Sequence, residues 1–236
     1  MQTNILDINF DVIKIDDAAQ KILDCIENNQ KCFVTTPNPE IVMLAQKDTL
    51  LKKILNESDL TIPDGIGIVL ASKLNKIKIS ERVAGYDLVQ KIFQLAKNKT
   101  VYFLGSSDEV IKLAKKNMAE KFPNIKIVGA HNGFFENSDE IVTQINLLAL
   151  DILLVGMGAP KQEKWIYKYK NDLNAKIFIG VGGSFDVMSG KVKRAPVFFQ
   201  KLGLEWFYRL LSQPKRFWRM RTLPQFLFKV LLKKFS

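Results

Sequence analysis

Apolar residues recur along this chain at two spacings, one typical of helices and one typical of buried strands. From Asp16 onward, Ala19, Ile22, Leu23 and Ile26 form one helical stripe. Asn38-Pro39 opens a second helix, because proline suits the first helical position. Short apolar runs predict strands at 32–35, 60–62, 101–104, 125–128, 151–155 and 176–179, and most are separated by predicted helices at 84–97, 108–121, 138–149 and 160–170. Continuous apolar strands that alternate with helices predict an α/β fold with a parallel sheet covered by helices on both faces.

The strand patterns stop after about residue 190, and the rest of the chain predicts helices. We therefore expect two parts, an α/β domain over residues 1–195 and a helical appendage over 196–236. The length of 236 residues suits one large α/β domain with an appendage. Pro214 and Pro224 divide the appendage into short helices.

Charge separates the same two parts. The formal net charge is +11, and residues 189–236 hold twelve lysines and arginines but one acid, Glu205. Residues 1–188 are neutral overall, so the whole excess lies in the last fifth of the chain, together with ten of its aromatic residues. This asymmetry predicts an anionic partner for that end, either a membrane surface or a nucleic acid.

The sequence also indicates the cellular compartment in which we expect the protein. The first residues lack a basic stretch followed by an apolar block, and no window approaches roughly 18 uninterrupted apolar residues. Cys25 and Cys32 lack the spacing of metal ligands and suit a reducing compartment. We expect a cytoplasmic protein.

Several predicted strands end in glycine or a small polar residue, where the ligand sites of parallel α/β sheets lie. These turns fall at 35–38, 63–67, 104–107, 155–160 and 180–184. Glycines let backbone amides approach an anion, and helix N-termini add a positive dipole end. The pattern favours a phosphate-bearing ligand, although any single glycine is equally explained by a tight turn.

The sequence lacks the residues that several other kinds of nucleotide, metal or catalytic site require. No dinucleotide fingerprint and no Gly-Lys-Ser/Thr phosphate loop is present, and no Asp-X-Asp pair offers ligands for a divalent ion on a diphosphate. A single histidine, His131, supports neither a zinc cluster nor a Ser–His pair, and its expected role is structural. The sequence thus predicts no metal and no cofactor.

The remaining candidates are a carboxylate, an arginine and an amide. Asp64 follows a predicted strand and is placed as a general base, or as the N-cap of the helix beginning near Gly65. Arg82 lies in a loop, where it binds a ligand or is simply solvated or ion-paired. Gln162 lies in the first turn of a helix after a glycine loop and reaches a ligand or faces water.

Five stretches resemble the WecG/TagA/CpsF glycosyltransferase family, in order and with matching spacing over nearly the whole chain. They are residues 36–40 (TPNPE), 63–67 (PDGIG), 81–85 (ERVAG), 156–165 (GMGAPKQEKW) and 182–186 (GGSFD), the last running into 193–196 (KRAP). The resemblance implies a Rossmann-like catalytic domain and an inverting, metal-independent transferase. In the TagA branch, N-acetylmannosamine (ManNAc) passes from its UDP donor to N-acetylglucosamine (GlcNAc) on undecaprenyl diphosphate, which makes the linkage unit of wall teichoic acid.

Site roles follow from the same resemblance, position by position. Asp64 is implied as the catalytic base, and the substrate-binding residues are Thr36, Asn38, Arg82, Gln162, Arg209, Arg216 and Arg219. The nucleotide site is expected to include Gly105, Gly156, Gly158, Gly182, Gly183 and Asp186. Arginines suit a departing diphosphate, because a planar guanidinium binds two phosphate oxygens at once.

Alternatives remain for the donor and for the tail. A relative in this family could use another UDP-sugar, such as N-acetylmannosaminuronic acid or a hexose. A basic tail could instead bind nucleic acid, but we expect no nucleic-acid partner, because the tail is amphipathic and lacks a recognised nucleic-acid motif. Leu223, Phe226, Leu227, Val230 and Leu231 form one apolar stripe, which predicts either an interfacial helix on an anionic membrane or a helix packed on the protein. We expect a mobile tail that closes the active site at the inner face of the cell membrane. The resemblance also implies a homo-oligomer.

Overall fold

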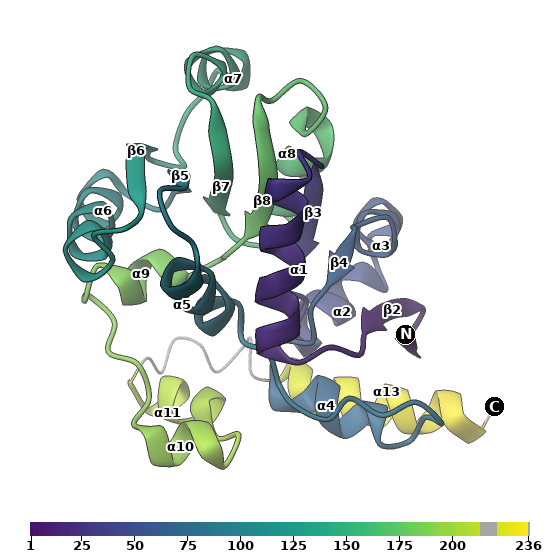
Figure 1. Cartoon of the computed structure of the whole chain (residues 1–236). Coiled ribbons are helices and arrows are strands. Elements are labelled where there is room, and N and C mark those ends of the chain that lie inside the picture. The colour runs from purple at the N-terminus through teal and green to yellow at the C-terminus, as the bar shows by residue number, and fades with distance from the viewer. Residues whose placement is uncertain (213–220, 236) are drawn as a thin grey trace.

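The computed structural model describes residues 1–212 and 221–235, and its centre is a six-stranded parallel sheet (Figure 1). Along the sheet the strands lie in the order β4-β3-β8-β7-β5-β6. Their bounds are Cys32–Thr35 for β3, Leu60–Thr61 for β4, Thr100–Gly105 for β5, Lys126–His131 for β6, Leu150–Gly156 for β7 and Ala175–Gly180 for β8. The predicted α/β class is confirmed, and each strand predicted from an apolar run is present.

Helices cover both faces of the sheet, because strand side chains alternate between the faces. In β5, Val101 and Phe103 join one apolar cluster, whereas Tyr102 and Leu104 join the other. The first face carries α1 (Ile15–Glu27), α5 (Gly85–Leu95), α6 (Asp108–Lys121) and α9 (Ser184–Met188). The second carries α3 (Thr49–Asn56), α7 (Ser138–Asn146) and α8 (Lys161–Tyr169). The helix expected at 108–121 coincides with α6, and the neighbouring predictions differ from the structure by a few residues at their ends.

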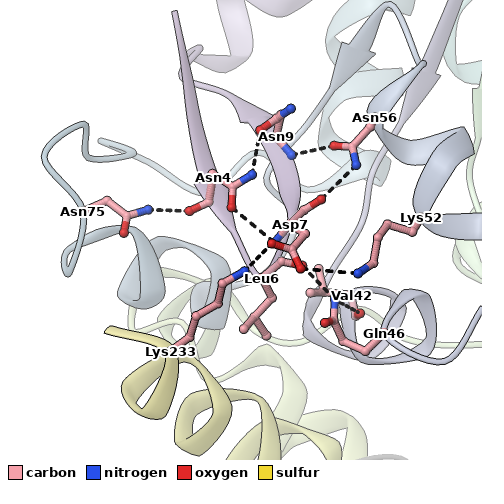
Figure 2. Close-up of polar contacts among 10 residues, drawn as sticks. All are labelled: Asn4, Leu6, Asp7, Asn9, Val42, Gln46, Lys52, Asn56, Asn75 and Lys233. Atoms are coloured by element: carbon pink, nitrogen blue, oxygen red, sulfur yellow. Dashed lines mark hydrogen bonds and ion pairs between the residues drawn. The ribbon is translucent and has the colours of Figure 1, made fainter. Parts of the chain in front are cut away.

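An N-terminal hairpin was not predicted. β1 (Gln2–Ile5) pairs antiparallel with β2 (Ile8–Asp11), and the two-residue turn between them has positive φ at both Leu6 (50°) and Asp7 (63°). Such turns normally carry Asn-Gly or Asp-Gly, so Leu-Asp gives no local signal for one. Tertiary contacts stabilise the turn instead: Leu6 is buried, and its carbonyl accepts a hydrogen bond from Gln46 Nε2 at 2.7 Å (Figure 2).

Asp7, at the tip of this hairpin, connects it to the C-terminal helix. Its carboxylate pairs with Lys52 and with Lys233 of α13 (Thr222–Phe235), and its carbonyl accepts a hydrogen bond from Asn56 (Figure 2). The hydrogen bond from Lys233 is the main cause that lowers the pKa of Asp7. The two ends of the chain are therefore joined through one carboxylate.

Most of the apolar stripe predicted on the last helix faces the protein rather than a membrane, and only its last member, Leu231, is exposed. α13 packs against α2 (Pro39–Ala45) and α4 (Ile66–Ser72). Phe226 is completely buried in the third apolar cluster, with Leu227 and Val230 packed against it. The interfacial placement of this stripe is thus wrong, and the alternative, packing on the protein, is what the structure shows. The stripe is covered because the hairpin, α2 and α4 together present an apolar surface that the local sequence of α13 does not reveal.

Other apolar side chains of the C-terminal helices remain exposed. α10 (Val197–Lys201) and α11 (Glu205–Ser212) lie beyond the same end of the sheet as α13 (Figure 1). The exposed residues of these helices and the loop between the first two are Val197, Phe198, Leu202, Phe207, Leu211, Phe228, Leu231 and Leu232. Within the described ranges, no helix has the length and apolar character needed to span a bilayer.

Candidate active site

A cleft of about 460 Å³ lies at the carboxyl ends of β3, β4, β7 and β8. β3 and β8 are neighbours in the sheet but far apart in the sequence, the kind of position where α/β sheets bind ligands. The cleft brings together most of the residues expected from the sequence: Thr36, Asn38, Asp64, Arg82, Gly156, Gly158, Gln162, Gly182, Gly183 and Asp186.

Thr36 and Asn38 follow β3 and are held by hydrogen bonds within the protein. Thr36 Oγ1 donates to the carbonyl of Gly180 at 3.1 Å, which links the end of β3 to the end of β8. The side chain of Asn38 is the N-cap of α2 and accepts from the amide of Ile41 at 3.0 Å, with Pro39 in the first turn. Both side chains line the cleft with these bonds already made.

Asp64 follows β4 and lines the cleft, where it is partly exposed. The N-cap of the following helix is Gly65, which has φ of 90° and no side chain. Capping of α4, the alternative considered from the sequence, therefore does not account for Asp64. A partly exposed carboxylate at the mouth of a strand-end cleft is suitably placed to accept a proton from a bound hydroxyl group.

Gln162 is buried and bridges two glycine turns. Its Oε1 accepts hydrogen bonds from the amide of Gly158 (3.2 Å), between β7 and α8, and of Gly182 (3.0 Å), between β8 and α9. Its amide thus has structural partners as well as a position on the cleft wall, and does not simply face water. No atom lies within 4 Å of where a Cβ would stand on either glycine, and both have positive φ (78° and 49°), so these turns are open towards the cleft.

Gly105 takes a different place from the other glycines expected at the nucleotide site. It does not line the cleft; instead it packs on the backbone of Gly156, where a Cβ would come within 2.3 Å of the Gly156 carbonyl oxygen. The next residue, Ser106, does line the cleft. Gly105 therefore permits the close approach of β5 and β7 beneath the site.

Two arginines and two acids form a network at one wall. Arg82 contacts Glu205 of α11 at 3.0 Å and lies 3.9 Å from Asp87, while Arg194 binds Asp87 through both terminal nitrogens. Arg194 also stacks on the ring of Tyr86, 4.9 Å from its centroid. Burial alone would lower the pKa of Arg194, but its bonds to Asp87 and the charge of Glu205 raise it overall. The guanidinium group of Arg194 therefore stays charged beside the cleft.

Sequence reasoning did not single out Arg194, Tyr86, Glu205 or Trp206, all of which line the cleft. A signal for Arg194 was present, because it lies in the KRAP stretch that carries part of the family resemblance. Glu205 and Trp206 belong to α11, and Thr222 and Leu223 of α13 complete this wall. The C-terminal helices thus contribute directly to the cleft.

The three appendage arginines expected from the resemblance are described only in part. Arg216 and Arg219 lie outside the described residues, and for Arg209 only its backbone position in α11 is described. His131, by contrast, has a structural contact, with Nδ1 2.8 Å from the carbonyl oxygen of Asn132. In the described ranges, no three histidine, cysteine or acidic side chains gather as a metal site would require.

Asp64 and other carboxylates, two arginines and open glycine turns meet at the carboxyl edge of a parallel sheet. This combination is suited to binding an anionic group, and comparison with known proteins shows that the chain is a glycosyltransferase. The chain belongs to the glycosyl transferase WecG/TagA/CpsF family, whose model matches residues 3–236.

Similar proteins carry one enzymatic name. A protein of Bacillus spizizenii is 38% identical over 208 residues, which cover 87% of this chain and 81% of the relative, and one of Bacillus subtilis matches to the same extent. A Staphylococcus aureus protein is 34% identical over 234 residues, covering 97% of this chain and 92% of the relative. Each is named N-acetylglucosaminyldiphosphoundecaprenol N-acetyl-beta-D-mannosaminyltransferase.

Proposed function

We propose that this enzyme transfers ManNAc from UDP-ManNAc to GlcNAc on undecaprenyl diphosphate, the reaction that makes the linkage unit of teichoic acid. The observation that carries the proposal is the match to relatives named for this transfer, which extends through the regions that form the cleft. A panel of UDP-sugars offered with a lipid-diphosphate-GlcNAc analogue tests it by release of UDP. Release with UDP-N-acetylmannosaminuronic acid or a UDP-hexose, but not with UDP-ManNAc, would assign the alternative donor.

The proposed reaction is a single in-line displacement. The acceptor hydroxyl oxygen attacks the anomeric carbon, the bond from that carbon to the UDP oxygen breaks, and UDP leaves with the bonding electron pair. Asp64 accepts the hydroxyl proton, so the chemistry needs one base and inverts the anomeric configuration. General-base catalysis of this kind contributes about 10²–10⁴ in rate.

Positive groups at the cleft would stabilise the departing UDP. Arg82 and Arg194 place their guanidinium groups at one wall, where Glu205 and Asp87 pair with them. The open turns at Gly158 and Gly182 also line the cleft, together with Gly156, Gly183 and Asp186, and their backbone amides would contribute there. Fixed charges and dipoles aimed at developing negative charge are the main means of catalysis where no metal takes part. Arg209, Arg216 and Arg219 are proposed to join them from the C-terminal segment.

We expect transfer to persist in EDTA. Arginines and backbone amides take the place of a divalent ion in this mechanism, so removal of free metal should leave kcat and KM within about twofold of their untreated values. The measurement is UDP release by protein dialysed against chelator. Loss of turnover that is restored by Mg²⁺ or Mn²⁺ would contradict a metal-independent reaction.

We propose that the exposed apolar face of the C-terminal helices rests on the inner face of the cell membrane. The acceptor is anchored in lipid, and α10, α11 and α13 combine exposed phenylalanines and leucines with the basic part of the sequence. Each basic residue near an anionic surface contributes about 1 kcal/mol, which suits reversible binding. The enzyme would then act as a peripheral membrane protein in the cytoplasm.

Replacing both Phe228 and Leu232 with serine is expected to reduce binding to anionic vesicles at least about fivefold, since each side chain is more than half exposed on α13. The measurement is co-sedimentation with vesicles containing phosphatidylglycerol. Leu147→Ser is the matched control, because Leu147 is exposed at the end of α7, at the opposite end of the molecule (Figure 1). Equal loss in both variants, or no loss in the double variant, would contradict this orientation.

We also propose that the enzyme forms a homo-oligomer, as the family resemblance implies. Sedimentation velocity tests this, and a species with the mass of one chain at all concentrations would contradict it.

A further inference from the structure

Glu163 is an acid buried beneath the cleft floor. Its side chain follows Gln162 in the first turn of α8 and is only 2% exposed. Burial raises the pKa of its carboxyl group. One oxygen, Oε1, accepts a hydrogen bond from Gln162 Nε2 at 2.8 Å, and among the described residues the other, Oε2, has no hydrogen-bond partner. An apolar side chain would fill this space without the cost of desolvating a carboxyl group, so packing alone does not explain the residue.

The hydrogen bond from Gln162 indicates what the carboxyl group of Glu163 does. Because Glu163 accepts from Nε2 of Gln162, the amide is oriented with its oxygen towards the two glycine turns. That oxygen accepts from the backbone amides of Gly158 and Gly182, which belong to different strand-to-helix connections. A single side-chain oxygen therefore sets the separation of the two turns that form one side of the cleft.

Gly180, at the end of β8, leaves room for the side chains of Gln162 and Glu163. A Cβ on Gly180 would come within 2.8 Å of Gln162 Nε2 and 3.5 Å of Glu163 Oε1. Gly180 is also the residue whose carbonyl accepts the Thr36 hydroxyl. The absence of a side chain at position 180 thus leaves room for the Gln162–Glu163 contact directly below the cleft.

We propose that Glu163 is a positioning residue for donor binding: it orients Gln162, and Gln162 holds the turns at Gly158 and Gly182 at the separation that the UDP-sugar requires. This inference rests on the proposed function, since it assumes a UDP-sugar donor at these turns. Asp64 lies after β4, on the other side of β3 from β8. Loss of the positioning contact should therefore raise KM for the donor far more than it lowers kcat.

Two substitutions at position 163 and one control test the proposal. Glu163→Leu removes the acceptor and keeps most of the volume, whereas Glu163→Gln keeps an oxygen that can accept from Gln162. Ile166→Ala is the control for stability, because Ile166 is fully buried on the same helix and does not line the cleft. The measurements are Kd for UDP by calorimetry, KM and kcat for transfer, and the melting temperature.

We expect Glu163→Leu to raise Kd for UDP and KM for the donor at least about tenfold with kcat within about threefold, since small displacements in a site cost one to two orders of magnitude. Glu163→Gln should stay within about threefold of the wild type in all three constants. Wild-type binding by Glu163→Leu, or an equal loss in Ile166→Ala, would overturn the proposal. If Glu163→Leu does not fold, Gly180→Ala tests the second step of the proposal, that Gln162 holds the two turns, because the added Cβ would lie 2.8 Å from Gln162 Nε2 and displace the amide. Unchanged binding of UDP by this variant would contradict the proposal.

Different results would contradict the proposed transferase function and the positioning role of Glu163. A wild-type protein that neither binds UDP nor transfers sugar from any UDP donor would overturn the proposed function. A wild-type protein that does both, alongside a Glu163→Leu variant with unchanged constants, would overturn only the positioning role.

Discussion

Asp64→Asn is expected to lower kcat for sugar transfer at least a hundredfold, while Kd for UDP and the melting temperature stay close to those of the wild type. Asparagine has nearly the same size and polarity as aspartate but does not accept the acceptor's proton, and a general base contributes about 10²–10⁴ in rate. Stability should change little, because Asp64 is partly exposed and Gly65, not Asp64, is the N-cap of α4. The measurements are single-turnover transfer, UDP calorimetry and thermal unfolding.

Asp172→Asn is a matched control for this variant. Asp172 is exposed in the turn that precedes β8, at the opposite end of the sheet from the cleft, so the same chemical change there should leave transfer unaltered. Retention of more than about a tenth of the wild-type kcat by Asp64→Asn would contradict the general-base role. A matching fall in melting temperature would assign the loss to folding instead.

Phe226→Ala is expected to lower the free energy of unfolding by about 3–5 kcal/mol, the usual cost of deleting a buried aromatic side chain. Phe226 is completely buried in the cluster formed with the hairpin, α2 and α4. Because Thr222 and Leu223 of the same helix line the cleft, weaker docking of α13 should also reduce transfer. Chemical denaturation measures the stability, and UDP release measures the activity.

Phe228 provides the comparison, two residues along the same helix but 63% exposed. Phe228→Ala should change stability by no more than about 0.5 kcal/mol, as exposed substitutions usually do. Equal destabilisation by the two variants would contradict the packing of α13 through Phe226. If Phe226→Ala were fully stable, the helix would not be docked through this residue.

The sheet could be predicted because its strands are continuous apolar runs, a pattern that depends only on burial of both faces. The hairpin could not, since its turn residues Leu6 and Asp7 adopt positive φ only with the support of distant side chains such as Gln46 and Asn56. α3 was also missed, because the helix predicted from Pro39 ends at Ala45 and a second helix begins after the cap at Asp48. The hairpin depends on contacts distant in the sequence, whereas the cap that begins α3 is a local contact, from the Leu51 amide to the Asp48 side chain.

The positions of several site residues could be predicted from the parallel sheet. The carboxyl ends of parallel strands meet at one edge, so Thr36, Asp64 and Gly182 had to lie close together. Their partners were not predictable. Arg82 forms a hydrogen bond with Glu205, which lies 123 positions away in the sequence, and no local sequence pattern predicts that pair. The stripe around Phe226 shows the same limit, since periodicity identifies an apolar face but not the surface that covers it.

The most direct test of the central claim is analysis of the product formed from UDP-ManNAc and a lipid-diphosphate-GlcNAc analogue. Wild-type protein, in chelator, should yield one product whose mass is that of the acceptor plus a single N-acetylhexosamine, with one UDP released per product and an anomeric configuration opposite to the donor's. Asp64→Asn should yield almost none over the same time. UDP release without a glycosylated acceptor, or a product that retains the donor's configuration, would contradict a single displacement onto the lipid-linked sugar.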